Sequence, residues 1–236
     1  MTDAVFQRDS YLQQLDAVVT ALDAEFVELD QTIFYAEGGG QPGDTGRLTG
    51  VSGRSVTLID TRKGVEPGSI WHQVSGEDHG LTVGDKVELA IDWERRYRLM
   101  RMHTSMHLLG SLIPVPVTGG KVGADKSRLD FNLGDQQLDK EWLTEQMNVL
   151  IQAGHDFGLE AITEAELDAN PGLVRTMSVQ PPRGLGDIRM VRVQGIDFQP
   201  CGGTHVRNTS EIGPVKISQI ENKGRQNRRV HLLLDS

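Results

Sequence analysis

Cysteine is nearly absent from this chain of 236 residues, which has only Cys201. A single cysteine cannot form an intrachain disulfide and suits a reducing compartment. The chain also has no apolar run near the ~20 residues that a membrane-spanning helix needs. Its first residues, MTDAVFQRDSYLQQ, lack the apolar core of a signal peptide. We therefore expect a cytoplasmic globular protein with no membrane partner.

An excess of positive charge is also missing, since the net charge is −9, which at first argues against a nucleic-acid partner. The acidity is confined to residues 1–92, with 16 acidic and 6 basic side chains, whereas residues 93–236 have 17 and 18. Two basic clusters stand out in the second region: Arg95, Arg96, Arg98 and Arg101, and Lys216, Lys223, Arg225, Arg228 and Arg229. Such clusters can hold a phosphate backbone even on an acidic protein. From charge alone, solvated helix and hairpin faces explain them equally well.

The segment EGGGQPGDTG contains the spacing of a dinucleotide fingerprint at Gly38, Gly40 and Gly43. That motif must close a strand and open a helix, but Pro42 interrupts it, no helical period follows, and the P-loop lysine is absent. A nucleotide loop is therefore excluded. The segment is either an ordinary glycine-rich turn, which we favour from these residues alone, or a loop whose bare amides reach a ligand.

Short extended runs separated by glycine and aspartate clusters occupy the first 92 residues. The runs lie at 17–22, 25–30, 55–60, 69–74 and 86–92. Their spacing is that of a small barrel or sandwich, so we expect an antiparallel β domain over 1–92.

The pattern changes at Asp92, a candidate N-cap, where an apolar stripe predicts a helix up to Pro114. A second helix is predicted over 138–154 and a short third one at the capping box Thr163–Glu166. Strands are expected over 187–194, 214–220 and 228–234. The fold class is therefore α+β, with a second domain over 93–236 whose helices pack on an antiparallel sheet.

Two pairs of residues have metal-ligand chemistry: His103 and His107 in HTSMH, and Cys201 and His205 in CGGTH. Imidazole nitrogen and thiolate sulfur are preferred by Zn²⁺, and a helix would place His103 and His107 one turn apart. Thr104 stands where the metalloprotease motif needs glutamate, so a zincin is excluded. A structural site would use all four ligands, but such sites more often use several cysteines, so catalysis is favoured. The alternative is two unrelated histidine pairs and a buried cysteine.

The remaining histidines have no partner at ligand spacing, and we take them as surface or core residues: His72, His79, His155 and His231. Arg128 and Asp130 lie on an alternating segment, SRLDFNL, that also fits a half-buried strand.

Together these segments resemble the alanyl-tRNA editing family, which comprises the editing domain of alanyl-tRNA synthetase and free-standing AlaX proteins. The resemblance rests on HTSMHLLGSL, CGGTHVRNTSEIG, KISQIENKGRQNRRV and FYAEGGGQPGDTG, and on SRLDFN, in which Leu129 replaces a phenylalanine. It covers roughly residues 30–235. It implies a free-standing protein of the medium type, with a β-barrel before the editing domain.

The resemblance also implies that the four residues His103, His107, Cys201 and His205 bind Zn²⁺, and that the protein hydrolyses the ester of tRNA(Ala) mischarged with serine or glycine. Thr104 would offer a hydroxyl to a serine side chain; otherwise it is a packing residue of the helix. Substrate contacts are expected from the glycine-rich segment and the SRLDFN segment: Gly38, Gly39, Gly40, Gln41, Asp44 and Arg128. Contacts to the acceptor stem are expected mainly through phosphate, from Lys223, Arg225, Arg228 and Arg229.

Two other functions remain open at this point, and neither involves DNA. The first is a tRNA-binding module in which zinc only stabilises the domain. The second is a zinc hydrolase acting on a small ester or amide, for which the C-terminal arginines would be dispensable.

Overall fold

The computed structural model describes residues 1–76, 79–134, 136–177, 180–181, 183–184, 186–224 and 226–235. The chain divides into two compact units, unit 1 (Met1–Tyr97) and unit 2 (Arg98–Ser236). The division falls inside helix α1 (Trp93–Leu112), a few residues after the boundary expected at 92. Within the described part, no helix has the length and apolar character needed to cross a membrane.

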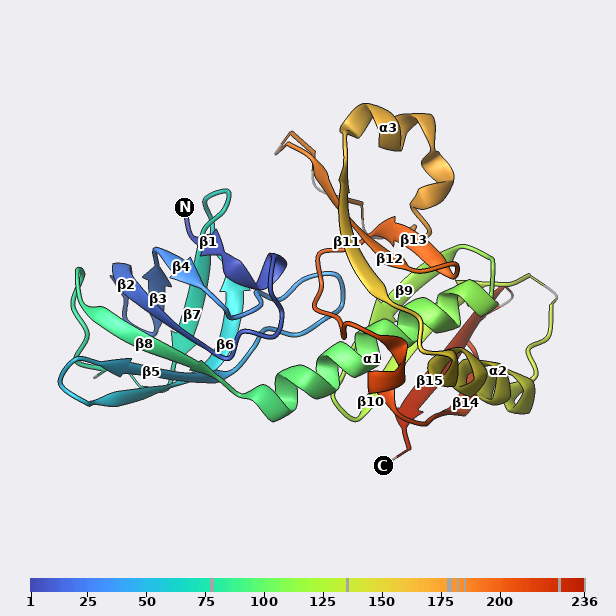
Figure 1. The fold of residues 1–236 in the computed structure, drawn as a ribbon, viewed down its shortest axis with the longest axis horizontal. Coiled ribbons are helices and arrows are strands. Elements are labelled where there is room, and N and C mark those ends of the chain that lie inside the picture. Colours follow the sequence, from blue (N-terminus) through green and yellow to red (C-terminus); the bar gives the residue numbers. More distant parts are fainter. Residues whose placement is uncertain are drawn as a thin grey trace. The chain divides into compact units, whose positions relative to one another are not determined.

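Unit 1 contains a closed antiparallel barrel, seen at the blue end of the chain in Figure 1. Its strands, in barrel order, are β2 (Gln14–Asp23), β3 (Phe26–Leu29), β7 (Ile70–Val74), β6 (Ser55–Lys63), β5 (Gly46–Gly50) and β8 (Lys86–Ile91). Strand β8 pairs with both β2 and β5, and this closure removes the free strand edges that an open sheet would present. Apolar residues alternate along β8, where Val87, Leu89 and Ile91 are buried in the barrel core. The predicted β-barrel is confirmed.

Short elements complete unit 1. Strand β1 (Asp3–Ala4) pairs in parallel with β4 (Gln31–Thr32), and a 3-10 turn, η1 (Val5–Gln7), buries Phe6. Next to β4, His72 is buried, with Nε2 2.8 Å from the Thr32 hydroxyl and Nδ1 2.9 Å from the Val27 carbonyl oxygen. Burial lowers the pKa of His72 to about 4, so the ring is neutral and Nδ1–H donates to the carbonyl. His72 is a core residue.

Unit 2 contains two antiparallel sheets and most of the helical structure (Figure 1). The four-stranded sheet runs in the order β14 (Val215–Asn222), β15 (Asn227–Leu234), β10 (Lys126–Asn132) and β9 (Val117–Lys121). The three-stranded sheet has the order β11 (Phe157–Ile162), β12 (Ile188–Val193) and β13 (Asp197–Pro200). Besides α1 there are α2 (Lys140–Ala153), α3 (Glu164–Ala169) and two 3-10 turns, η2 (Pro171–Leu173) and η3 (Thr209–Ile212).

Helix α2 packs along the edge strand β14 and satisfies part of its backbone. The Asn148 side chain donates to the Val215 carbonyl oxygen at 2.8 Å and accepts from the Val215 N–H at 3.0 Å. The Thr144 hydroxyl oxygen accepts from the Ile217 N–H at 3.1 Å. The helix therefore covers an edge that would otherwise present unpaired groups. The α+β class, with helices packed on an antiparallel sheet, is confirmed.

The predicted helix limits follow from capping. Asp92 accepts from the Arg95 N–H at 3.2 Å, and α1 ends two residues before Pro114. Asp139 caps α2, and Gly154 ends it in the left-handed conformation with φ of 71°. Thr163 and Glu166 form the capping box of α3.

Helix α1 differs from the expected one-sided stripe, because residues 102–110 are all buried. Its hydroxyl groups are accommodated by bonds to backbone one turn earlier: Thr104 donates to the Met100 carbonyl oxygen at 3.0 Å and Ser105 to that of Arg101 at 2.8 Å. A helix that is buried all round is central to its unit rather than on its surface.

Candidate metal centre

The structure brings together the four residues that have metal-ligand chemistry. His103 and His107 come from successive turns of α1, and Cys201 and His205 from the loop that follows β13. One ligand atom of each lies within 4.8 Å of the others, and the three histidines are buried while Cys201 is half-buried. The Cys201 Sγ lies 3.6 Å from His103 Nε2 and 3.3 Å from His205 Nε2. This cluster can hold a metal ion.

The imidazole rings form a compact group. Ring centroids are 4.4 Å apart for His103 and His205, 4.8 Å for His107 and His205, and 5.4 Å for His103 and His107. Phe157, the first residue of β11, stacks on His205 at 4.6 Å with 22° between the ring planes. This contact limits the directions in which the His205 ring can turn.

His107 is held by a buried carboxylate that the sequence did not single out. Its Nδ1 lies 2.8 Å from Asp197 Oδ2, and the side chain of Asp197 is fully buried. The Gln199 amide donates to the same Oδ2 at 2.7 Å. When Nδ1 carries the proton and donates to Asp197, the lone pair of Nε2 is left for a metal.

His205 is held in a comparable way by Thr104. The Thr104 hydroxyl oxygen lies 3.3 Å from His205 Nδ1 and 3.2 Å from the Val206 N–H, and its proton goes to the Met100 carbonyl oxygen. One donor and two acceptor positions are the full capacity of a hydroxyl group. In this structure Thr104 is buried and orients His205; its predicted contact with a substrate is untested.

The charges at the cluster shift its pKa values strongly. Burial by itself raises the pKa of the Cys201 thiol, but His103 and His205 more than offset it, so that the pKa lies well below its usual range. Burial and the charge of His103 hold the pKa of His205 well below its ordinary value. Burial would lower the pKa of His107 too, yet Asp197 and Cys201 raise it to about 9. The set therefore favours a thiolate, the form that binds metal.

The sequence does contain a signal for Asp197 and Gln199. They precede Cys201 by four and two residues, and the side chains of a strand alternate, so positions 197, 199 and 201 share one face. Extending the strand pattern back from CGGTH would have placed both polar side chains beside the ligands. The segment 197–200 was not predicted as a strand because it has only four residues, with mixed polarity.

The glycine-rich segment forms a tight turn in unit 1. The Gly38 N–H donates to the Gln41 carbonyl oxygen at 3.1 Å and the Gln41 N–H to that of Gly38 at 2.9 Å. Gly39 and Gly40, at the tip, have φ of 57° and 82°, which glycine adopts without strain. These two residues are exposed, whereas Gln41 is buried. The predicted substrate contacts of Gly38, Gly39, Gly40 and Gln41 remain predictions.

Asp44 has a structural role in unit 1. Its Oδ2 receives the guanidinium of Arg96 and the Tyr35 N–H, and the side chains of Asp44 and Arg96 are 1% and 0% exposed. Arg96 also donates to the carbonyl oxygens of Ser10 and Ile33. Because Arg96 is buried and paired with Asp44, it is not available to bind phosphate with the other arginines of the first basic cluster. A contact between Asp44 and a substrate is untested.

Several residues predicted to bind substrate or tRNA form a charged group on the four-stranded sheet of unit 2. Asp130 accepts two hydrogen bonds from Arg229, both at 2.8 Å, and one from Arg128 at 2.6 Å. Lys223 pairs with Glu221 at 2.7 Å. Arg228 donates instead to oxygens of Asn222, Gly224 and Asn227. Arg225 lies outside the described residues.

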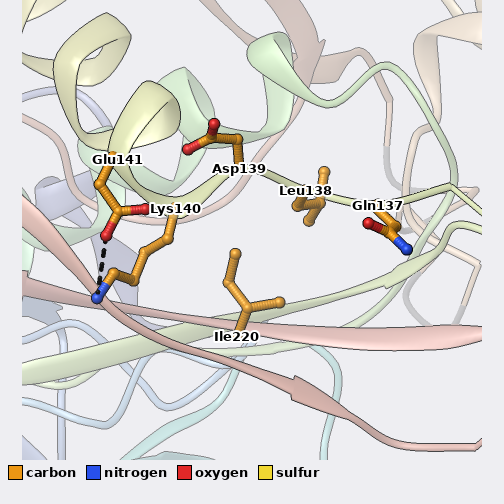
Figure 2. A pocket seen from close by; sticks show the side chains of 6 residues that line it. All are labelled: Gln137, Leu138, Asp139, Lys140, Glu141 and Ile220. Carbon is orange, nitrogen blue, oxygen red and sulfur yellow. Dashed lines mark ion pairs between the residues drawn. The ribbon is translucent and has the colours of Figure 1, made fainter.

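A depression at the start of α2 is separate from the metal-ligand cluster (Figure 2). It is lined by Gln137, Leu138, Asp139, Lys140, Glu141 and Ile220. Lys140 lies 3.5 Å from its neighbour Glu141, on the same side of the depression. Lys140 is paired with Glu141, and Asp139 caps α2, so we assign no ligand to this depression.

Two features thus define the class of protein: a closed β-barrel unit and an α+β unit with three histidines and one cysteine gathered for a metal. Comparison with protein families supports a link to translation. Residues 188–231 match the family described as the threonyl and alanyl tRNA synthetase second additional domain. Residues 4–95 match that described as class II (A) tRNA synthetases.

Relatives match the whole length of the chain. It is 39% identical to the alanyl-tRNA editing protein AlaX-M of Methanosarcina barkeri, over 99% of both chains. It is 33% identical to the protein of that name from Saccharolobus solfataricus, over 98% of both. An alanine–tRNA ligase of Sulfurisphaera tokodaii matches at 33% identity over 93% of this chain, which spans 25% of the ligase. The chain belongs to the AlaX-M family of alanyl-tRNA editing proteins.

Proposed function

We propose that this protein is a zinc-dependent deacylase that hydrolyses the ester of tRNA(Ala) mischarged with serine or glycine. The observation that carries the proposal is the cluster of His103, His107, Cys201 and His205 in a chain that belongs to an alanyl-tRNA editing family. The proposal places the reaction in the cytoplasm, where charged tRNA is used.

The donor set fits zinc. Three imidazole nitrogens and one thiolate are preferred ligands of Zn²⁺, with bonds of about 2.0–2.1 Å to nitrogen and about 2.3 Å to sulfur. In a tetrahedron these lengths put sulfur about 3.6 Å from nitrogen. The observed Cys201 distances, 3.6 Å to His103 and 3.3 Å to His205, are close to that edge. Hard cations such as Mg²⁺ prefer oxygen and are disfavoured here.

Zinc, when bound, would act as a Lewis acid that polarises the ester carbonyl or lowers the pKa of water to about 7. The residues of this chain would hold that centre in place. Asp197 and Thr104 keep the outer nitrogens of His107 and His205 occupied, so that the inner ones face the cluster. Cys201 is the most exposed of the four, which makes its side of the cluster the approach for a substrate.

Binding of tRNA would use basic groups with room for a phosphate. Arg228 fits this role best among the described candidates, because the hydrogen bonds that hold it go only to carbonyl and amide oxygens. Lys223 and Arg229 would have to share their charge with Glu221 and Asp130. We keep Arg225 and the turn at Gly39 and Gly40 as further contacts of the substrate.

The decisive assay measures the release of amino acid from Ser-, Gly- and Ala-tRNA(Ala) by the full-length protein. We expect release of serine or glycine and little release of alanine, and a chelator should abolish the reaction until zinc is restored. Release that is equal with and without metal would contradict the zinc dependence. Equal hydrolysis of the three substrates would contradict the editing specificity.

Variants separate this function from a tRNA-binding module with a structural zinc. His103→Ala should stop deacylation, and His155→Ala is the matched control, since His155 lies outside the cluster. Zinc-loaded protein that binds tRNA but never deacylates it would favour the structural role. Hydrolysis of small esters with unchanged rates in Arg228→Gln would favour a hydrolase of small substrates.

A further inference from the structure

We propose that Asp197 is a positioning residue that fixes the tautomer and orientation of His107 and thereby sets the affinity of the centre for its metal. This inference rests on the proposed function in taking the cluster to bind zinc. It concerns a side chain that lies behind the ligands and outside the HTSMH and CGGTH motifs.

The contact between Asp197 and His107 restricts the imidazole ring. Asp197 Oδ2 lies 2.8 Å from His107 Nδ1, and both side chains are buried. A carboxylate only accepts hydrogen bonds, so Nδ1 carries a proton in this contact, and Nε2 is the nitrogen left to give a lone pair to a metal when one binds. A histidine without such a partner would populate both tautomers and would rotate about χ2. The pair therefore removes states of His107 that cannot bind a metal.

The carboxylate of Asp197 is itself held in place by its neighbours. Gln199 donates to Oδ2 at 2.7 Å, and Arg175 Nε lies 3.7 Å from Oδ1. Arg175 is anchored in turn to α1 through the Gly110 carbonyl oxygen at 2.9 Å. Oδ1 is buried and has no hydrogen-bond partner among the described atoms. A buried carboxylate with one oxygen left in this way is costly, and Asp197 depends on its contacts with His107, Gln199 and Arg175.

Asp197 and the candidate ligand Cys201 lie four residues apart in the same extended segment. Asp197 and Gln199 lie on β13, and Cys201 follows directly on the same face of the extended chain. The Cys201 N–H also donates to the Arg189 carbonyl oxygen at 3.3 Å, which extends the pairing of β13 with β12. Strand β13 therefore positions two residues at once: Cys201, which belongs to the cluster, and Asp197, which contacts the outer nitrogen of His107.

The experiment measures the zinc dissociation constant of the full-length protein by competition with a chromogenic chelator. We expect Asp197→Ala to weaken zinc binding by about 10- to 100-fold, the range found for partners behind metal-bound histidines. Asp197→Asn keeps an acceptor but loses the charge, so it should lie between Ala and the native protein. Asp187→Ala, an exposed aspartate just before β12, is the matched control and should leave the constant unchanged.

A second measurement distinguishes positioning from a merely structural role. Cobalt(II) replaces zinc, and its visible absorption reports the coordination geometry. We expect an altered spectrum for Asp197→Ala and restoration towards the native spectrum in Asp197→Asn. If Asp197→Ala fails to fold, the comparison of Asp197→Asn and Gln199→Ala with the native protein decides, and both should weaken zinc binding.

An unchanged zinc dissociation constant in Asp197→Asn and Gln199→Ala would overturn the inference. So would equal destabilisation of the metal-free and zinc-loaded forms with no change in affinity. These outcomes are independent of catalysis. A protein that binds zinc through the Asp197-supported site but deacylates nothing would contradict the proposed function and leave the role of Asp197 intact.

Discussion

Unit 1 and unit 2 both contain buried histidines, and His72 in unit 1 and His107 in unit 2 respond to burial in opposite ways. His72 in the barrel contacts a hydroxyl and a carbonyl group, and burial lowers its pKa to about 4. His107 in unit 2 is also buried, but Asp197 and Cys201 raise its pKa to about 9. Burial disfavours the charged ring in both places, and only an anionic neighbour reverses the effect.

The buried carboxylates of the two units also differ in the side chain that each one contacts. Asp44 in unit 1 faces the guanidinium of Arg96, which has only donors to offer. Asp197 in unit 2 faces a histidine, which can exchange a proton for a metal. Asp44 and Arg96 are thus committed to each other and serve stability, whereas His107 in unit 2 belongs to a cluster that can hold a metal.

Removing one member of the pair formed by Asp44 and Arg96 should have the largest effect. Arg96→Met leaves Asp44 buried without its cation, so the free energy of unfolding should fall by about 3–5 kcal/mol. Urea unfolding of the full chain measures the change. Arg8→Met is the control, because the ion pair of Arg8 with Asp3 is exposed and should contribute almost nothing. A loss as small as that of the control would show that the buried pair is dispensable.

The neutral His72 predicts a specific dependence on pH. Between pH 6.5 and about 4 the unfolded chain binds a proton at this position and the folded barrel does not. Stability is therefore fully present above pH 6.5 and falls as the pH drops through this window, by up to about 3 kcal/mol. Unfolding at pH 7, 5.5 and 4.5 checks it, with His72→Phe as the comparison. The variant should lose stability less steeply on acidification; an identical slope would contradict the assignment.

Removal of the metal should act on unit 2 alone. Free zinc at 100 times its dissociation constant stabilises the state that binds it by about 2.7 kcal/mol. Calorimetry of the full chain with zinc and with a chelator should therefore shift the transition of unit 2, while that of the barrel stays in place. Equal shifts of both transitions would show that the units do not unfold independently.

The smallest effect is expected at the surface arginines. Among the described residues, Arg228 donates its hydrogen bonds to neutral oxygens, while Arg229 is held by Asp130. If Arg228 contacts a phosphate, Arg228→Gln should weaken tRNA binding about threefold and reduce the salt slope by about 1. Arg229→Gln should change affinity less. The affinity for tRNA, measured at several salt concentrations, distinguishes the two variants. A larger loss of affinity in Arg229→Gln than in Arg228→Gln would show that Arg229 leaves Asp130 to bind the tRNA.

Most of the helices and strands that were predicted correctly follow from local sequence patterns. The helix limits at Asp92, Gly154 and Thr163 follow from capping groups within a few residues. The long strands of the barrel follow from alternation, as in β8. Strands β9 and β11 were not predicted from the sequence. Strand β9 reads VTGGK, with two glycines, and β11 has exposed residues on both of its faces, so its sequence shows no clear alternation of apolar and polar residues. Pairing with a neighbour, rather than propensity, makes them strands.

The candidate site divides in a similar way. The identity of His103, His107, Cys201 and His205 could be predicted, because ligand chemistry and spacing are properties of the residues themselves. Asp197 was missed because its role depends on which side chain lies opposite it, 90 positions away in sequence. Arg96 was assigned to a surface cluster because charge alone does not report burial.

The sequence by itself determined the donor atoms of the cluster, the capped helices, the alternating strands and the membership of an editing family. These depend on residue type and short spacing, which are present before folding. The tertiary structure decided which polar groups face each other: Asp44 with Arg96, Thr104 with His205, and Asp197 with His107. Burial makes those pairings matter, because a polar group removed from water is stable only beside the partner that the fold supplies.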